Sequence, residues 1–411
     1  MRPEFEPPSS GLTDASGDLS ICERAREELQ NTVLVIKTGA TESRRKVPVH
    51  SQTTLRCWPN VLFLSDFDES IGGHQVHDAL DHVSEQIRLE HPSFELWRRL
   101  HAHGRSAIEI SDSETGDNVY WESGTTDMQA GWHLARFMNL AMSVKALEFH
   151  PDARWFVFID ADTYISWSGF LGLARTLDHT KPLYVGYPAA MGPNMFFGHG
   201  GSGYALSQAA LTQVVESYQA QQSRWDTDAV ENEFGEVPFA KLLLSIGIDL
   251  SWALPHFQRG DPASMDFSMM EHGRRAWCYP AVTYHHVGPD DIRRLHRFEG
   301  AWNRTSDGRH FRHSDVYRSM GLPIAMKGDA DGWDNLSEHV VEGVDDYASC
   351  REACRERQTC VQYSFNLGQC RTSSALKRGR ATEGAASGWV VDRVHRMMES
   401  LDTRCHGKFL I

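Results

Sequence analysis

Short apolar runs that end in polar residues recur along the first part of the chain. They are rich in β-branched and aromatic residues and do not alternate with polar ones, which is typical of strands buried on both faces of a parallel sheet. The runs occupy residues 32–37, 61–65, 155–159, 183–187, 248–252 and 281–287. They predict an α/β fold whose first strands open a nucleotide-binding sheet.

Between these runs, apolar residues recur at helical spacing. The predicted helices cover residues 76–90, 126–149, 167–177, 208–218 and 239–246. Pro92 is expected to end the first helix, and Thr126 or Asp127 is expected to cap the second. In an open sheet of alternating strands and helices, the ligand crevice lies at the carboxyl ends of the strands.

Length and charge narrow the class of protein. The chain has 411 residues, which predicts two or three domains, and its 41% hydrophobic and 23% charged residues are ordinary for a globular protein. A formal net charge of −14 argues against nucleic acid as a main partner. An anionic substrate would therefore need a local metal ion or a local basic group.

The N-terminal residues differ in composition from the rest of the chain. No stretch is apolar enough to predict a membrane span or a signal peptide, so the chain as given is expected to be soluble. Residues 1–20, with prolines, serines and acids, are expected to be a disordered lead-in. A membrane anchor upstream of this segment is possible.

The eight cysteines favour disulfides over metal ligands because no CxxC pair is present. Four of them lie between Cys350 and Cys370. Disulfides indicate an oxidising compartment. Two glycosylation sequons, at Asn303 and Asn335, are consistent with that compartment.

Two acids, Asp160 and Asp162, follow the apolar run 155–159 directly. Paired carboxylates at a strand end can form a hard oxygen site for Mg2+ or Mn2+, and such a metal can bind a diphosphate. The alternative is a plain acidic turn. At another strand end, one of His285 and His286 is a candidate third ligand.

Two further segments carry candidate chemistry. Residues 196–207 hold four glycines within six positions, which lets the backbone approach a ligand, and His199 and Ser202 add polar groups to this turn. A tight turn before the next helix is the alternative. The acids of residues 226–236 are expected to form a solvated face, except Glu236, which a helix N-terminus can fix.

The chain resembles the Fringe-like and core-1 β1,3-galactosyltransferase group of inverting glycosyltransferases (glycosyltransferase family 31), and most of all its fungal branch. The resemblance rests on IDADTY, HGGSGYALS, GEVPFAKLL and TYHHV, which occur in the order of that family. It implies a GT-A fold over residues 21–325 that binds a UDP-sugar with Mn2+ or Mg2+. It also implies the secretory pathway, either the Golgi lumen with a type II anchor or secretion.

The resemblance also implies roles for individual residues. Asp162 would bind the metal directly, Asp160 would lie near the ribose or sugar, and His285 would be a further metal ligand. Glu236 would be the catalytic base, although relatives usually carry two acids there and this chain has Gly235 before it. The nucleotide would meet the two residues that follow the first strands, and two residues of the glycine-rich turn would line the sugar and acceptor. These four positions are Thr38, Asp66, Gly201 and Ser202.

Residues 326–411 form a separate unit with the spacing Cys-x3-Cys-x5-Cys-x9-Cys. A predicted helix with two cysteines on one face, followed by a hairpin, resembles a PAN/apple module. That resemblance implies the bridges Cys354–Cys360 and Cys350–Cys370. Such modules commonly bind protein or carbohydrate, and a purely stabilising role is the alternative.

These observations lead to a first hypothesis, a metal-dependent transferase moving a hexose, most readily galactose, from a UDP-sugar to a glycan or glycoprotein hydroxyl. A second hypothesis is an inactive carbohydrate-binding protein that uses the same scaffold and the C-terminal module. A third is a nucleotide-sugar hydrolase, which would release free sugar at full rate without an acceptor. Replacing Asp162 by Ala should abolish UDP binding under the first hypothesis and leave glycan binding intact under the second.

Overall fold

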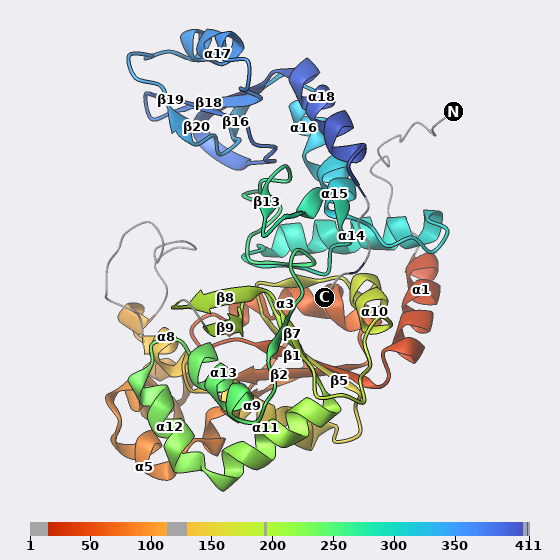
Figure 1. The fold of residues 1–411 in the computed structure, drawn as a ribbon. Coiled ribbons are helices and arrows are strands. Elements are labelled where there is room, and N and C mark those ends of the chain that lie inside the picture. The colour runs from red at the N-terminus through yellow and green to blue at the C-terminus, as the bar shows by residue number, and fades with distance from the viewer. Residues whose placement is uncertain (1–14, 113–129, 193–194, 406–408, 410–411) are drawn as a thin grey trace.

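The computed structural model describes residues 15–112, 130–192, 195–405 and 409, the side chains from Cys22 onwards (Figure 1). A large α/β domain is followed by a smaller module, which lies above it in the view of Figure 1. Within the described residues, no helix is both long enough and apolar enough to cross a membrane.

An eight-stranded sheet forms the centre of the large domain, in the order β11-β7-β10-β5-β1-β2-β4-β3. The central strands β5, β1 and β2 are parallel, and β10 runs antiparallel to both β5 and β7. The strands are β1 (Thr32–Lys37), β2 (Asn60–Ser65), β3 (Glu69–Ile71), β4 (His74–Asp78), β5 (Trp155–Asp160), β7 (Tyr184–Gly186), β10 (Tyr204–Ser207) and β11 (Leu250–Trp252). The predicted α/β class is confirmed, and each predicted apolar run contains a strand.

Alternate residues of the central strands point to opposite faces, so the sheet has two apolar cores. Val33 and Val35 face one core, whereas Leu34 and Ile36 face the other. Helices α6 (Glu95–His103), α9 (Met138–Phe149), α11 (Gln208–Ala220), α12 (Gln222–Glu231) and α13 (Glu236–Ser245) cover the first face. Helices α1 (Ala15–Glu28) and α10 (Trp167–Ala174) cover the second.

Several predicted elements need correction. The helix predicted over residues 76–90 is wrong at its start: Val76 lies in β4, and the helical parts are a short 3-10 turn (Leu80–His82) and α5 (Glu85–Glu90). Gly72 and Gly73, both with positive φ, turn the chain into a β3–β4 hairpin, which brings Val76 beside Phe63 of β2. The helix does end before Pro92, as predicted.

The segment 126–149 is divided between α8 (Ala130–Ala135) and α9, and the proposed caps Thr126 and Asp127 lie outside the described residues. The lead-in predicted for residues 1–20 is too long, because α1 begins at Ala15, and residues 1–14 lie outside the described part. Strand β10 was not predicted. It is inserted between β5 and β7, and the glycine-rich turn therefore ends in a strand rather than a helix.

A second, three-stranded sheet in the order β12-β15-β6 adjoins the carboxyl end of β5. Its strands are β6 (Tyr164–Ile165), β12 (Phe257–Gln258) and β15 (Thr283–Tyr284). Two hairpins flank it, β8 (Pro188–Met191) with β9 (Met195–Gly198) and β13 (Met270–Glu271) with β14 (Arg274–Arg275). The remaining α-helices that the structure describes in this domain are α2 (Ser43–Lys46), α3 (Pro48–Gln52), α4 (Thr54–Cys57), α14 (Pro289–Thr305), α15 (His313–Met320) and α16 (Leu322–Ala325).

We call residues 329–402 the C-terminal module. Its five strands form an antiparallel sheet in the order β16-β20-β18-β19-β17, flanked by α17 (Tyr347–Glu356) and α18 (Val391–Asp402). The strands are β16 (Asp329–Asp334), β17 (His339–Val340), β18 (Gln362–Asn366), β19 (Gln369–Ser373) and β20 (Arg380–Trp389). The resemblance to a PAN/apple module stays a prediction.

All eight cysteines are paired. In the module, Cys350 is bonded to Cys370 and Cys354 to Cys360, the pairing implied by the resemblance. In addition, Cys22 is bonded to Cys57, and Cys278 to Cys405. Four disulfides are consistent with a protein of the secretory pathway or a secreted protein.

The sequon at Asn335 does not mark an accessible asparagine. This residue is fully buried, and its side-chain nitrogen donates to the carbonyls of Tyr363 (3.0 Å) and Gly388 (3.2 Å). A sugar on that nitrogen would remove one donated hydrogen and would have no space. The sequon reading is therefore wrong at this position, where the amide links β16 to the neighbouring strands.

Candidate active site

Asp160 is the last residue of β5 and lies beside Lys37, the last residue of β1. The Lys37 Nζ atom is 2.9 Å from Asp160 Oδ1. Burial alone lowers the pKa of Lys37, but Asp160 and then Glu236 outweigh it, so the pKa lies above its ordinary value. The parallel register of two strands therefore gives the first predicted acid a partly buried cationic partner.

Asp162 follows in the turn after β5, where it faces a second lysine and two imidazoles. Its Oδ2 atom lies 3.1 Å from Lys46 Nζ, and its Oδ1 atom lies 3.4 Å from His285 Nε2. Burial would raise the pKa of Asp162, yet His285, His286 and Lys46 together hold it well below its usual value. The carboxylate is thus kept ionised within a cationic setting.

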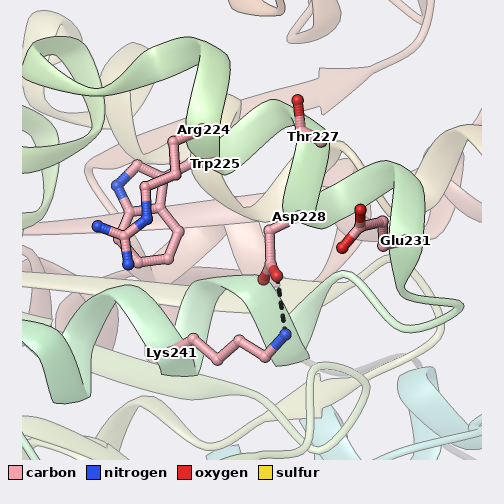
Figure 2. A pocket seen from close by; sticks show the side chains of 6 residues that line it. All are labelled: Arg224, Trp225, Thr227, Asp228, Glu231 and Lys241. Atoms are coloured by element: carbon pink, nitrogen blue, oxygen red, sulfur yellow. Dashed lines mark hydrogen bonds and ion pairs between the residues drawn. The ribbon is translucent and has the colours of Figure 1, made fainter.

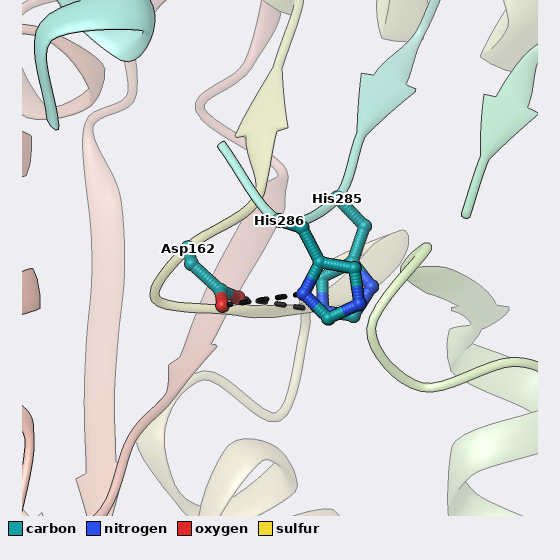
Figure 3. Close-up of side chains that lie close together, drawn as sticks. All are labelled: Asp162, His285 and His286. Carbon is teal, nitrogen blue, oxygen red and sulfur yellow. Dashed lines mark ion pairs between the residues drawn. The ribbon is translucent and has the colours of Figure 1, made fainter. Parts of the chain in front are cut away.

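The two histidines come from the end of β15, and Figure 3 shows both imidazoles directed toward Asp162. Their rings stack with centroids 3.7 Å apart, and His286 Nδ1 is 3.9 Å from Asp162 Oδ2. His285 is 6% exposed, whereas the side chain of His286 is 44% exposed and its backbone has a φ of 57°. One donor atom from each of the three residues fits within a group no more than 4.8 Å across.

This donor set fits a divalent metal ion. Imidazole nitrogen and carboxylate oxygen together suit ions such as Mn2+, and the buried Nδ1 of His285 has no hydrogen-bond partner among the residues that the structure describes. Asp160 is near the group, with Oδ2 3.9 Å from His285 Nε2, but it is engaged by Lys37. The structure brings together the predicted residues Asp162 and His285 and adds His286.

Hydrogen bonds hold the loop of the acids, the histidine strand and the glycine-rich turn together. Val287 N donates to the Asp162 carbonyl (2.8 Å), next to the pairing of β15 with β6. The hydroxyl of Thr163 donates to the Gly201 carbonyl, and the hydroxyl of Thr283 to the Ser202 carbonyl, each at 2.6 Å. Three segments distant in sequence therefore meet in one rigid arrangement.

The glycine-rich turn leaves room for two side chains. A Cβ atom on Gly200 would lie 2.2 Å from Glu236 Oε1, and a Cβ atom on Gly201 would lie 2.1 Å from His285 Cε1. Side chains larger than hydrogen at these two positions would displace the acid and the histidine. The turn is therefore more than a connection, because it sets the places of Glu236 and His285.

Ser202, predicted to line the sugar, is fully buried. Its Oγ and its backbone N lie 2.9 and 3.0 Å from His199 Nδ1. Burial, reinforced by His285, lowers the pKa of His199 to about 3, so this imidazole is neutral. Sugar binding by Gly201 and Ser202 stays a prediction, and the hydroxyl of Ser202 serves here to orient His199.

Glu236 is the first residue of α13 rather than the residue before the helix, and it is half-buried. A carboxylate in the first turn interacts favourably with the helix dipole. Its charge also acts on Lys37, Tyr184 and Tyr204, whose pKa values it helps to raise. A side chain at Gly235 would clash with the backbone of Arg136 (2.5 Å), so only one acid fits here.

Thr38 and Asp66 follow the parallel strands β1 and β2, at the same edge of the sheet. Asp66 Oδ1 accepts from Ala40 N (2.6 Å) and from Ser65 Oγ (2.9 Å). Among the described residues, neither Asp66 Oδ2 nor Thr38 Oγ1 has a hydrogen-bond partner, although both are buried. Burial raises the pKa of Asp66. Two orphaned polar atoms at one edge are suited to a ligand that offers hydrogen bonds.

Sequence reasoning missed Lys37, Lys46 and His50. His50 lies in α3, and its Nε2 atom is 2.8 Å from the carbonyl of Ala161, between the two acids. Lys37 could have been predicted, because neighbouring parallel strands end at the same edge of a sheet and Lys37 ends the strand beside Asp160. Lys46 and His50 had no such signal, since their contacts with residues 161 and 162 arise only in the folded chain.

The acids of residues 226–236 are not simply a solvated face. Asp226 is buried and accepts from Ser84 N (2.8 Å) and from the Tyr218 hydroxyl (2.7 Å). Beside it, α12 and α13 enclose a hollow of about 520 Å3, in which Asp228 pairs with Lys241 at 2.8 Å (Figure 2). None of the predicted site residues lines this hollow.

Residues 111–234 match the model of the Fringe-like family. This segment contains β5 with the two acids and the whole glycine-rich turn, and it ends two residues before Glu236. A search of curated proteins gave no match for the chain. The family match supports a glycosyltransferase of the Fringe-like group, which implies a GT-A-like fold, a sugar donor and a glycan acceptor.

Proposed function

We propose that this chain is a metal-dependent inverting glycosyltransferase that moves a hexose, most readily galactose, from a UDP-sugar to a hydroxyl of a glycan or glycoprotein. The observation that carries the proposal is the pair Gly200 and Gly201. A carboxylate, Glu236, and a histidine of a metal-type cluster, His285, lie against these two adjacent positions of the turn. A β1,3 linkage and a place in the Golgi lumen or in secretion belong to the same proposal.

The donor would lie along the carboxyl edge of the sheet. The orphaned atoms of Thr38 and Asp66 would hydrogen-bond the uridine, and Lys37 and Lys46 would face its diphosphate. Asp162, His285 and His286 would hold Mn2+ or Mg2+. When bound, that ion would neutralise charge on the departing UDP.

Glu236 would be the general base. Its carboxylate takes the proton of the acceptor hydroxyl while the hydroxyl oxygen bonds to the anomeric carbon and the bond from that carbon to the UDP oxygen breaks. No covalent enzyme intermediate is needed, so a single carboxylate suffices, and its contribution would be roughly 10^2- to 10^4-fold in rate.

The test measures UDP release with MnCl2, a panel of UDP-sugars and p-nitrophenyl glycosides as acceptors. Wild type is compared with Glu236→Gln and with Glu233→Gln, an exposed acid of the same segment as matched control. We expect one donor to be consumed only with acceptor. Glu236→Gln should lose roughly 10^2- to 10^4-fold in kcat while UDP binding by calorimetry stays intact, and Glu233→Gln should behave as wild type.

Two outcomes would contradict the proposal. Binding of UDP and Mn2+ without turnover of any donor would favour the inactive carbohydrate-binding protein. Release of free sugar at full rate without acceptor would favour a hydrolase.

A further inference from the structure

In Figure 1, β13 lies between the central sheet and the C-terminal module. Glu271 contacts the hydroxyl of Tyr187, and the ring of His272 lies 5.2 Å from that of Trp252. Trp252 ends β11, a strand parallel to β7, and β7 and β5 both run antiparallel to β10 between them. Trp252 is therefore at the same edge of the sheet as Asp160.

Ring contacts continue from the hairpin to the metal-type cluster. The ring of Tyr187 lies 6.4 Å from that of His199, which in turn lies 5.5 Å from that of His285. On the outer side, Trp252 packs against Phe196 of β9 with ring centroids 4.7 Å apart. The hairpin and these aromatic residues thus form one wall beside the site.

This wall exposes apolar surface. Met269 and Met270, at the start of the hairpin, are 49% and 53% exposed, and Phe196 and Trp252 are only half-buried. Aromatic rings with an accessible face and flexible methionines suit an apolar face of a partly polar ligand. A sugar ring has such a face, with hydroxyls at its edge.

The segment that leads into the hairpin is held by the C-terminal module. Phe267 N donates to the Leu376 carbonyl, and Gly379 N donates to the Ala263 carbonyl, each at 3.0 Å. Leu376 N donates to Asp266 Oδ1 (3.1 Å), which also accepts from Ser268 N (2.9 Å). The guanidinium of Arg275 then donates to the Ser268 carbonyl (2.7 Å) and closes the base of the hairpin.

Residues 376–379, the part of the module that contacts this segment, are themselves fixed by an ion pair and by packing. Arg378 donates to both carboxylate oxygens of Asp291 in α14, at 3.1 and 2.5 Å, and its side chain is 6% exposed. Leu376 is fully buried in an apolar cluster shared with Phe267 and Tyr317. Residues 376–379 are therefore a fixed support and not a loose contact.

We propose that the C-terminal module sets the acceptor side of the active site, by holding the β13–β14 hairpin in the wall that takes the acceptor's sugar ring. This inference rests on the proposed transferase function. Asp266 is a positioning residue, because it joins the module to the hairpin without itself facing the cluster of Asp162, His285 and His286. The module then governs acceptor binding and leaves the donor side unchanged.

The experiment compares Asp266→Ala with Asp266→Asn, which keeps the accepting oxygen. Asp346→Ala is the control, because it removes an exposed carboxylate of the same module that caps α17 far from this contact. Transfer is measured with MnCl2, UDP-galactose or the best UDP-sugar of the panel, and the best p-nitrophenyl glycoside. Hydrogen–deuterium exchange of residues 262–275 gives a readout that needs no turnover.

Asp266→Ala removes the hydrogen bonds that Leu376 N, Ser268 N and Ser268 Oγ donate to Asp266 Oδ1. Because the effect reaches the acceptor only through the hairpin, we expect the KM for the acceptor to rise roughly three- to tenfold. UDP affinity and the KM for the donor should stay unchanged, and residues 262–275 should exchange faster. Asp266→Asn should restore the wild-type KM for the acceptor and the wild-type exchange rate of residues 262–275. Asp346→Ala should match wild type in both.

Wild-type acceptor kinetics in Asp266→Ala, or an equal change in donor and acceptor KM, would overturn the inference. If Asp266→Ala folds poorly, the double variant Asp291→Asn with Arg378→Gln replaces it, and the same split between acceptor and donor KM decides. A wild type that turns over no donor would overturn the proposed function itself. That outcome differs from active wild type with unaffected variants, which overturns only the role of the module.

Discussion

At the scale of single residues, the site depends on two glycines of one turn. Gly200 and Gly201 have no Cβ, and Glu236 and His285 occupy the space that a Cβ would need. His285 is also buried, so it has little freedom to move aside. The residue type at two positions of this turn thus controls where Glu236 and His285, which belong to other segments, can lie.

Gly201→Ala should therefore weaken metal binding. The added methyl would lie 2.1 Å from His285 Cε1, so the imidazole must rotate away from Asp162. We expect roughly a 10- to 100-fold loss of Mn2+ affinity in calorimetric titration with MnCl2 in the presence of UDP. Gly260→Ala is the control, because its Cβ meets only Ser264 Oγ at 3.4 Å. Equal Mn2+ affinity in the two variants would contradict this account.

At the scale of elements, the short strand β15 carries the histidines and has little pairing of its own. It is supported by His313 of α15, whose Nε2 donates to the Pro255 carbonyl (2.9 Å) and whose Nδ1 accepts from the Tyr284 hydroxyl (2.6 Å). In this arrangement the neutral imidazole donates through Nε2 and accepts through Nδ1. Burial, with the nearby His256, lowers the pKa of His313 to about 3.

This histidine makes folding stability depend on pH. In the unfolded chain it titrates near its ordinary pKa of about 6.5, so the unfolded state binds more protons between that value and about 3. Its contribution is complete above the unfolded pKa and is lost as the pH falls. Between pH 7.5 and 5.5, wild type should lose about 1.4 kcal/mol of unfolding free energy more than His313→Gln. Urea unfolding at the two pH values measures this difference, and parallel losses in both proteins would refute it.

At the scale of the whole molecule, the large domain and the C-terminal module share an apolar core. One apolar cluster contains Tyr284 and Phe267 of the large domain together with Leu376 and Trp389 of the module. The disulfide Cys278–Cys405 closes the chain behind the module over a separation of 127 residues. The module is thus joined to the domain by packing, by charge and by a covalent bond.

The length of the closed loop predicts how much each disulfide stabilises the fold. Loop-closure entropy gives about 5 kcal/mol for Cys278–Cys405 and about 2 kcal/mol for Cys354–Cys360, whose cysteines are 6 residues apart. Replacing both cysteines of each bond by Ser should therefore cost more for the long loop. Urea unfolding of the two double variants measures this, and equal losses would count against the entropic explanation.

The α/β sheet and the strand ends that carry Asp160, Asp162 and His285 were predictable from the sequence. A strand whose residues are all apolar must be covered on both faces of the sheet. The polar residues that follow it then lie at the edge of the sheet. Local pattern could not predict β10, which inserts between two strands already assigned. The β3–β4 hairpin was missed because the spacing of Val76, Leu80 and Val83 also suits a helix.

The contacts of the site were decided by tertiary structure alone. Lys46 and His50 reach residues 161 and 162 across more than a hundred residues of chain, and no local period carries that information. The support of the β13–β14 hairpin by residues 376–379 likewise joins segments about a hundred residues apart, through backbone hydrogen bonds and the Asp266 carboxylate, and no local pattern marks it. The pattern of buried and exposed residues is a local property of the sequence, so the strands could be predicted from it. Contacts between distant residues depend on how the elements pack, so they could not be predicted in the same way.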